Sequence, residues 1–263
     1  MRPSRLPPTE GAITDAELPR YPLQGLPPER ARGLTGLAPG EEGGAASLDA
    51  LLSGALPGIV TSAHRVPDPL SEELEWVALG PGDRRLALVG GGSPHDLPAD
   101  TTVTVPDERC RALLRAHHPR LRPVGPDGAA RHAVVALWQH PGAEARGELL
   151  EQDSWLPRAG EGIPVLLRRA GGPGLPEGDP AAMAALRAER AVARAFPGAI
   201  LCVRGQPFGA RLRLQALILS PDGTRAVRGE TQGPQDLAED VARELADLLD
   251  ARGARLFTPP SPR

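Results

Sequence analysis

The C-terminal third of the chain, residues 179–257, carries the pattern that most limits how this protein can fold. In the run RLRLQALIL, apolar residues from Leu212 to Ile218 alternate with two arginines and a glutamine, as in a strand with one buried face. The next residues, SPDG, predict a tight turn into a hairpin partner, TRAVRGE. Two helices are predicted around these strands, one capped by Asp179 and one ending at Gly253. We therefore expect a small sheet with two helices packed against it.

The region before this third alternates between short apolar runs and a helical pattern. Runs of strand length, such as LEWVALG, RRLALVGG and RHAVVALWQ, are broken by Pro, Gly and Asp. The segment DERCRALLRAHHP has helical spacing, with Asp107 in the first turn and Cys110, Leu113 and Leu114 on one face. Strands that alternate with helices predict an α/β fold.

The basic residues exclude several classes of enzyme. All 30 of them are arginines, because the chain contains no lysine. Without lysine there is no Schiff base to a pyridoxal cofactor, no phosphate-loop lysine and no lysine general base. The net charge of -3 argues against a nucleic-acid partner that is held by bulk charge.

Cysteine content and apolar runs predict the cellular compartment. Cys110 and Cys202 are the only two cysteines, too few for a disulfide framework, and they do not form a C-x-x-C pair. No apolar run has the length of a membrane span, and the first residues lack the apolar region of a signal peptide. We expect a cytoplasmic protein with no membrane contact.

Polar motifs along the chain name no reaction by themselves. The six histidines show no spacing typical of a metal site, and the adjacent His117 and His118 would point about 100° apart on a helix. The glycine run GGGSPHDLP has no following lysine, and Ser62 and Ser154 lack a G-x-S-x-G context. We expect no metal site.

Several segments from about residue 50 to the end follow one another in the order of a known family. They are IVTSAHRVPDPLSEELEWVALGPGDRRLALV, DLPADTTVTVPDERCRALLRAHHPRL, SWLPRAGEGIPVLLRR and, at the end, LRAERAVARAFPGAI followed by LRLQALILSPDGTRAVRGE. They resemble the porphobilinogen deaminase (hydroxymethylbilane synthase) family in its A-V-H-S-x-K-D-x-P, T-S-S-L-R-R and L-P-A-V-G-Q-G-A segments and in its third domain.

The resemblance implies an α/β fold with three domains. Two would resemble type II periplasmic binding proteins, the first truncated or rebuilt, and a small C-terminal α/β domain would carry a covalent dipyrromethane cofactor on cysteine. The implied activity is that of a transferase of tetrapyrrole and haem biosynthesis, which joins four porphobilinogen units with loss of ammonia. An aspartate would handle the pyrrole nitrogens, and cationic side chains would hold the carboxylates. The implied parts are 1–46 (irregular), 47–95 with 163–178 (domain 1), 96–162 (domain 2), 179–257 (C-terminal domain) and 258–263 (tail).

This sequence departs from the family at the positions that carry the chemistry. His64 and Arg65 stand where the family has its Lys-Asp pair, so a cation replaces an anion where positive charge should develop. In the segment that resembles T-S-S-L-R-R, only the first arginine remains, as Arg109, and the acidic residues Asp107 and Glu108 enter. These changes favour loss of catalysis.

The cysteine that would carry the cofactor is displaced. The family's G-G-C falls on Gly198, Ala199 and Ile200, and Cys202 lies two residues further along the strand. A shift of two residues keeps a side chain on the same face of a strand but moves it by roughly 6–7 Å. Cys202 is therefore either a relocated attachment site or, as we favour, an inert buried thiol.

Three hypotheses about function follow from these observations. The leading one is a degenerate family member, a pseudoenzyme that has lost the dipyrromethane cysteine and the catalytic aspartate. The second is an active porphobilinogen deaminase with dipyrromethane on Cys202. The third is a non-catalytic module that binds carboxylates in general, pyrrole or tetrapyrrole carboxylates among them, or that regulates another enzyme of tetrapyrrole synthesis. Arg65, Arg109 and Arg204 are the candidate carboxylate ligands, and no nucleic-acid partner is expected.

Overall fold

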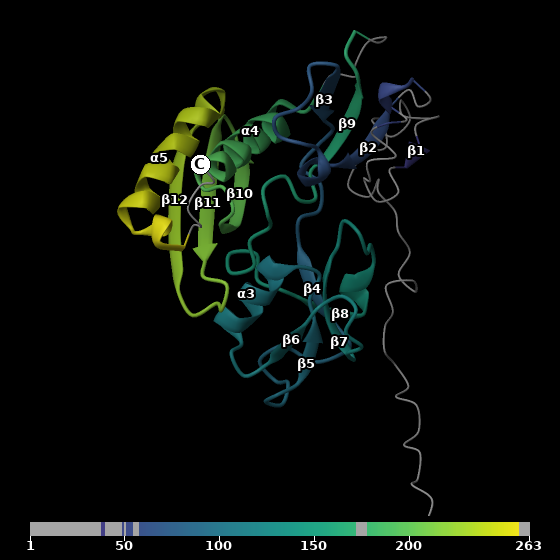
Figure 1. Ribbon diagram of the computed structural model, residues 1–263, viewed down its shortest axis with the longest axis vertical. Coiled ribbons are helices and arrows are strands. Elements are labelled where there is room, and N and C mark those ends of the chain that lie inside the picture. The colour runs from purple at the N-terminus through teal and green to yellow at the C-terminus, as the bar shows by residue number, and fades with distance from the viewer. Residues whose placement is uncertain (1–37, 40–48, 50, 55–57, 172–177, 258–263) are drawn as a thin grey trace, which may run out of the picture.

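The computed structural model describes residues 38–39, 49, 51–54, 58–171 and 178–257 (Figure 1). Their fold is mixed α/β with three sheets, which confirms the fold class predicted from the sequence. The predicted tail at 258–263 and most of the predicted irregular segment at 1–46 lie outside the described residues. Among the described helices, none is both long and apolar enough to cross a bilayer.

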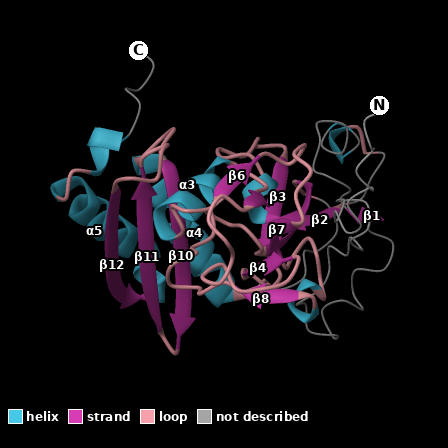
Figure 2. Cartoon of the chain, turned by 90° about the horizontal axis from the view of Figure 1, so that it is seen from below, coloured by secondary structure: helices cyan, strands magenta, loops and turns pink. Residues whose placement is uncertain are grey.

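The C-terminal sheet has three antiparallel strands in sequence order. Strands β10 (Ile200–Phe208), β11 (Arg211–Leu219) and β12 (Ala226–Pro234) pair along their full lengths. Helices α4 (Pro180–Ala195) and α5 (Ala238–Ala251) pack on one face of this sheet (Figures 1 and 2). The predicted sheet with two helices is confirmed.

Local capping explains where helix α4 begins. The side chain of Asp179 accepts a hydrogen bond of 2.9 Å from the Ala182 amide, and Pro180 occupies the first turn, where it needs no hydrogen-bond partner. Beyond helix α5, Gly253 has a φ of +87°, a backbone conformation that glycine adopts without strain. Both boundaries agree with the sequence prediction.

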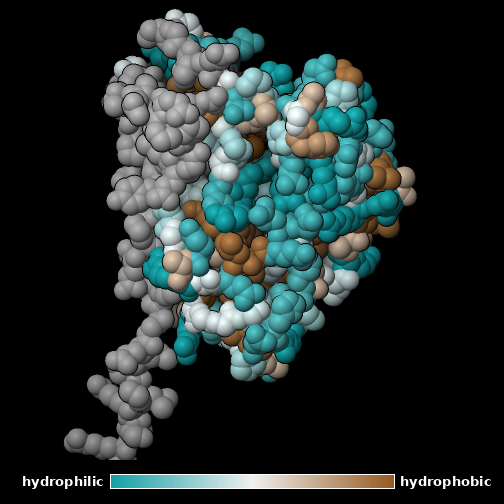
Figure 3. Space-filling model, turned by 180° about the vertical axis from the view of Figure 1, so that it is seen from behind, coloured by the Kyte–Doolittle hydropathy of each residue, from teal (hydrophilic) through white to brown (hydrophobic). Residues whose placement is uncertain are grey.

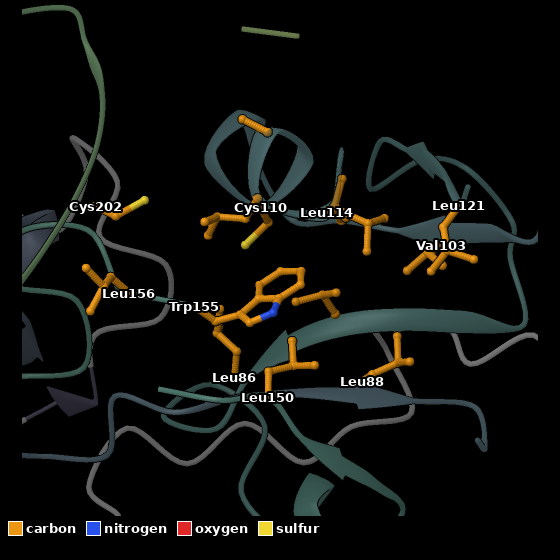
Figure 4. Close-up of a cluster of buried hydrophobic side chains, with 14 of the residues drawn as sticks. Leu86, Leu88, Val103, Cys110, Leu114, Leu121, Leu150, Trp155, Leu156 and Cys202 are labelled. Carbon is orange, nitrogen blue, oxygen red and sulfur yellow. The ribbon is translucent and has the colours of Figure 1, made fainter. Parts of the chain in front are cut away.

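The second face of strand β11 is buried, although its polar pattern predicts an exposed face. Gln215 is 1% exposed, and Leu217 and Leu219 are also buried. Leu217 and Leu219 are covered by helix α3 (Glu108–His117), which packs on this face of the sheet. Gln215 is hydrogen-bonded to Arg204 and Glu230. The sheet therefore lies between two helical layers, and the cluster on the α3 side contains Cys110, Leu114, Trp155, Leu156 and Cys202 (Figure 4).

Helix α3 belongs to a five-stranded sheet in the order β6-β5-β7-β4-β8. The helix begins at Asp107, whose side chain accepts a 2.7 Å hydrogen bond from the Cys110 amide. Strand β4 falls in the first of the predicted domains, and it pairs in this sheet with β7 and β8. The domain boundaries themselves stay a prediction. The strands are β4 (Leu86–Val89), β5 (Thr102–Thr104), β6 (Arg122–Val124), β7 (His132–Ala136) and β8 (Gly147–Leu149).

The third sheet joins two segments that are distant in sequence. Strand β9 (Pro164–Arg169) lies antiparallel between β2 (Ile59–Ser62) and β3 (Leu74–Ala78), and β1 (Ala38–Pro39) pairs parallel with β2. Seen from behind, the surface of the described residues is mostly polar, with apolar side chains gathered in small patches (Figure 3).

Candidate functional site

The loop 156–162, between β8 and β9, runs through the junction of the three sheets. The Val203 amide of strand β10 donates a 2.7 Å hydrogen bond to the Pro157 carbonyl oxygen, so the loop is tied to the C-terminal sheet. Gly160, with a φ of +73°, lies so close to the short helix η2 (Ala63–Arg65) that a Cβ atom would be 3.0 Å from the His64 amide nitrogen. Arg109 of helix α3 donates a hydrogen bond to the Leu156 carbonyl oxygen, so the loop brings the N-terminal part of α3, helix η2 and strand β10 together.

Helix α4 holds this junction from the other side through a buried carboxylate. Glu189 is 0% exposed and accepts hydrogen bonds from the amides of Gly160 at 2.8 Å and Gly205 at 2.6 Å. Arg84 completes the pair, with 2.9 Å between its Nη2 and Oε2 of Glu189, and its Nε donates to the Glu161 carbonyl oxygen. Through this ion pair and these hydrogen bonds, Glu189 links the C-terminal sheet, the segment before strand β4 and the loop before strand β9.

Arg109 is buried in this junction and is already paired with carboxylates of the chain. Its Nη1 donates a 2.7 Å hydrogen bond to the Leu156 carbonyl oxygen, and its Nη2 lies 2.9 Å from the Glu161 carboxylate. Asp107 lies 3.6 Å from the same Nη2 and also pairs with Arg158. We call Asp107, Arg109, Arg158 and Glu161 the junction cluster.

The charges of the junction cluster stabilise one another. Burial opposes ionisation of both Asp107 and Glu161, but the nearby Arg109 and Arg158 outweigh it and hold both carboxyl pKa values below their usual range. The cluster therefore contains two carboxylates facing two guanidinium groups, and its charge is balanced without a ligand.

His64 and Arg65 lie next to the junction cluster and contact Trp138, which follows strand β7. Nδ1 of His64 is 2.8 Å from the Ser62 hydroxyl oxygen, and its ring packs edge-on against the Trp138 ring at 5.1 Å between centroids. Burial lowers the pKa of His64 to about 4, so this imidazole is neutral at pH 7. The Arg65 guanidinium lies 5.0 Å from the centroid of the same indole, in a cation–π contact.

Arg204 lies on strand β10 and shares none of the partners of Arg109. It is 5% exposed and forms an ion pair with Asp153. It also donates hydrogen bonds to the side-chain oxygens of Gln152 at 3.1 Å and Gln215 at 2.8 Å. The structure thus places Arg109 against the loop 156–162, Arg65 in the neighbouring helix η2 over Trp138, and Arg204 among partners of its own.

Both cysteines lie in the buried cluster between helix α3 and strand β10. Cys202 is 0% exposed and packs close to Leu156, as Figure 4 shows. Cys110 is also 0% exposed, with its sulfur 3.4 Å from Nη2 of Arg109. Burial raises the pKa of Cys202 to about 12 and that of Cys110 well above its usual range, so both remain protonated thiols at pH 7.

Sequence reasoning missed four residues of this region. Trp138, Arg158, Glu161 and Glu189 carry no local pattern that marks them, because their partners come from other segments of the chain. The one available signal was Glu161, an acidic residue inside the glycine-rich segment RAGEG, where the resembling family has glutamine.

The comparison with known proteins identifies the family. No family model matches the chain. A porphobilinogen deaminase of Bordetella parapertussis is 36% identical over 245 residues, covering 81% of this chain and 78% of that protein. One from Rubrobacter xylanophilus is 33% identical over 231 residues, covering 78% of this chain and 75% of that protein. One from Burkholderia mallei is 32% identical over 235 residues, covering 78% and 71%.

The fold is that of a mixed α/β protein in which three sheets meet around a buried, charged junction. With relatives of this identity and coverage, the chain belongs to the porphobilinogen deaminase family. This confirms the resemblance seen in the sequence and connects the chain with tetrapyrrole biosynthesis.

Active members of the family imply a dipyrromethane cofactor on cysteine, and the surroundings of Cys202 do not fit one. The thiol has no exposed surface and is enclosed by apolar neighbours, which include Leu156, Leu217 and Leu219. A chain of two pyrrole rings with four carboxylates needs space and cationic partners. The raised pKa of the Cys202 thiol also leaves little of the thiolate form that attacks an electrophile.

Proposed function

We propose that this chain is a non-catalytic member of the porphobilinogen deaminase family. The observation that carries the proposal is the junction cluster, in which Arg109 binds the carboxylates of Glu161 and Asp107. Arg109 is the position at which the family resemblance implies a ligand for a substrate carboxylate. Here that arginine is 5% exposed and its strongest acceptors belong to the chain itself.

Two further features support the same proposal. Arg65 stands at the place of the family's aspartate, and a guanidinium has no lone pair to accept a pyrrole N–H and repels the cation formed on deamination. Cys202 is enclosed in a core cluster, whereas a cofactor attachment site needs an accessible thiolate. The arrangement thus keeps the packing of the fold and replaces the groups that the reaction needs.

The test is a porphobilinogen consumption assay on the purified full-length chain, with bilane formation followed by absorbance. Cys202→Ala is the matched control, because it removes the one displaced candidate for cofactor attachment. We expect the two proteins to consume porphobilinogen equally slowly, at the rate of buffer alone. Consumption by the wild-type chain that is lost in Cys202→Ala would instead establish an active deaminase with a relocated cofactor.

A further inference from the structure

Trp138 connects two parts of the fold at the edge of the candidate site. It lies two residues beyond the end of strand β7 of the five-stranded sheet, whereas the residues that contact its ring, His64 and Arg65, belong to helix η2 beside the four-stranded sheet. The ring centroids of Trp138 and His64 are 5.1 Å apart with the planes at 71°, and the Arg65 guanidinium lies 5.0 Å from the indole centroid. The indole is therefore held by the His64 ring in a T-shaped contact and by the Arg65 guanidinium over its face.

The two side chains that hold this ring stand at the positions of the family's Lys-Asp pair. An indole contains a pyrrole ring with its N–H, so Trp138 presents to His64 and Arg65 the same kind of ring that a porphobilinogen unit has. The Trp138 N–H is buried, and no described residue accepts a hydrogen bond from it. Arg65 cannot supply the acceptor that an aspartate in its place would offer.

The carboxylates of a pyrrole substrate also have counterparts within the chain. Glu161, which lies within electrostatic reach of His64, pairs with Arg109, and Asp107 pairs with Arg158. The chain itself thus supplies a ring against His64 and Arg65, and two carboxylates against Arg109 and Arg158 of the neighbouring junction cluster. This is the combination of groups that a porphobilinogen unit would bring.

We propose that Trp138 takes the place of a substrate pyrrole ring against His64 and Arg65, so that the chain occupies its own ligand site. This inference rests on the proposed function and deepens it, since it names the class of ligand that the site excludes: a pyrrole that carries carboxylates. The site is closed by a side chain and reopens when that side chain is shortened.

The test is porphobilinogen binding, measured by calorimetry on Trp138→Ala and on a matched control, Trp76→Ala. Trp76 is also a partly buried tryptophan under an arginine, with Arg190 5.0 Å from its ring centroid, but it lies in strand β3 and packs in a different hydrophobic cluster from Trp138. We expect Trp138→Ala to bind porphobilinogen at least tenfold more tightly than the wild-type chain, and Trp76→Ala to bind it no better. Equal binding by all three proteins would overturn the inference.

Indole serves as a second probe, because a cavity left by a tryptophan can accept the lost ring whether or not it is a ligand site. If indole raises the melting temperature of both variants while porphobilinogen binds neither, Trp138 is an ordinary core residue and the inference is wrong. If Trp138→Ala does not fold, the milder Trp138→Leu takes its place in the same comparison.

The two proposals fail in distinguishable ways. Turnover of porphobilinogen by the wild-type chain would refute the proposed non-catalytic function. An inactive wild-type chain, together with a Trp138→Ala variant that gains no affinity for porphobilinogen, would refute only the role given to Trp138.

Discussion

Replacing Glu189 with alanine removes the carboxylate that links the C-terminal sheet to the segment before strand β4 and to the loop before strand β9. Glu189 is fully buried on helix α4, where it pairs with Arg84 and accepts hydrogen bonds from the amides of Gly160 and Gly205. Without it, the Arg84 guanidinium, itself 11% exposed, loses its counter-ion, and two buried amides lose their acceptor.

The expected loss of stability follows from these contacts. Removing one partner of a buried ion pair costs about 3–5 kcal/mol, because the other charge stays buried and uncompensated. With a urea dependence of about 2 kcal/mol per molar, the midpoint of unfolding falls by roughly 1.5–2.5 M. The two unpaired amides make the upper part of this range the expected one.

The measurement is urea unfolding followed by circular dichroism, with Glu244→Ala as control, since Glu244 is exposed on helix α5. The double variant Arg84→Met with Glu189→Ala separates the contributions: removing the orphaned charge should restore part of the lost stability. A midpoint shift below 0.3 M in Glu189→Ala, by the order of magnitude used for exposed residues, would refute the reasoning that the junction depends on this ion pair.

Three further predictions concern pH, backbone and thiols. The free energy of unfolding should fall as the pH is lowered from about 6.5 to about 4. The reason is that His64 and His118 have a pKa of about 4 in the fold, so over this range they take up protons in the unfolded chain but not in the folded one. Urea midpoints that stay constant over this range contradict it. Gly82→Ala should lower the melting temperature by several degrees, since φ is +65° and a Cβ would lie 1.7 Å from a carbonyl oxygen; an unchanged melting temperature contradicts it. Cys110 and Cys202, both 0% exposed, should react with a thiol reagent only after denaturation, and rapid labelling of the native chain contradicts their burial.

The parts of the fold that sequence predicted are those set by local pattern. Strand β11, its hairpin partner and helix α4 with its Asp179 cap follow from alternation, turn residues and capping, which act within a few residues. The burial of Leu217 and Leu219 on the second face of β11 was not predictable in this way, because it depends on helix α3, which is folded from a different segment. Periodicity describes one face of an element at a time and not what covers the other.

The same distinction applies to the site. Sequence resemblance located Arg65 and Arg109, and the structure brings both to the junction next to the loop 156–162. It did not identify Glu161 or Trp138 as their partners, because pairs of this kind form only when the three sheets meet. Whether Arg65, Arg109 and Arg204 bind carboxylates of a ligand stays a prediction.

The central claim, that this chain keeps the fold of its family without the chemistry, is tested most directly by intact mass spectrometry. The purified chain is measured before and after incubation with porphobilinogen, beside Cys202→Ala. The account predicts the mass of the unmodified polypeptide in all samples. A mass increase equal to two pyrrole units, absent from Cys202→Ala, would contradict it and identify Cys202 as the attachment site of a working cofactor.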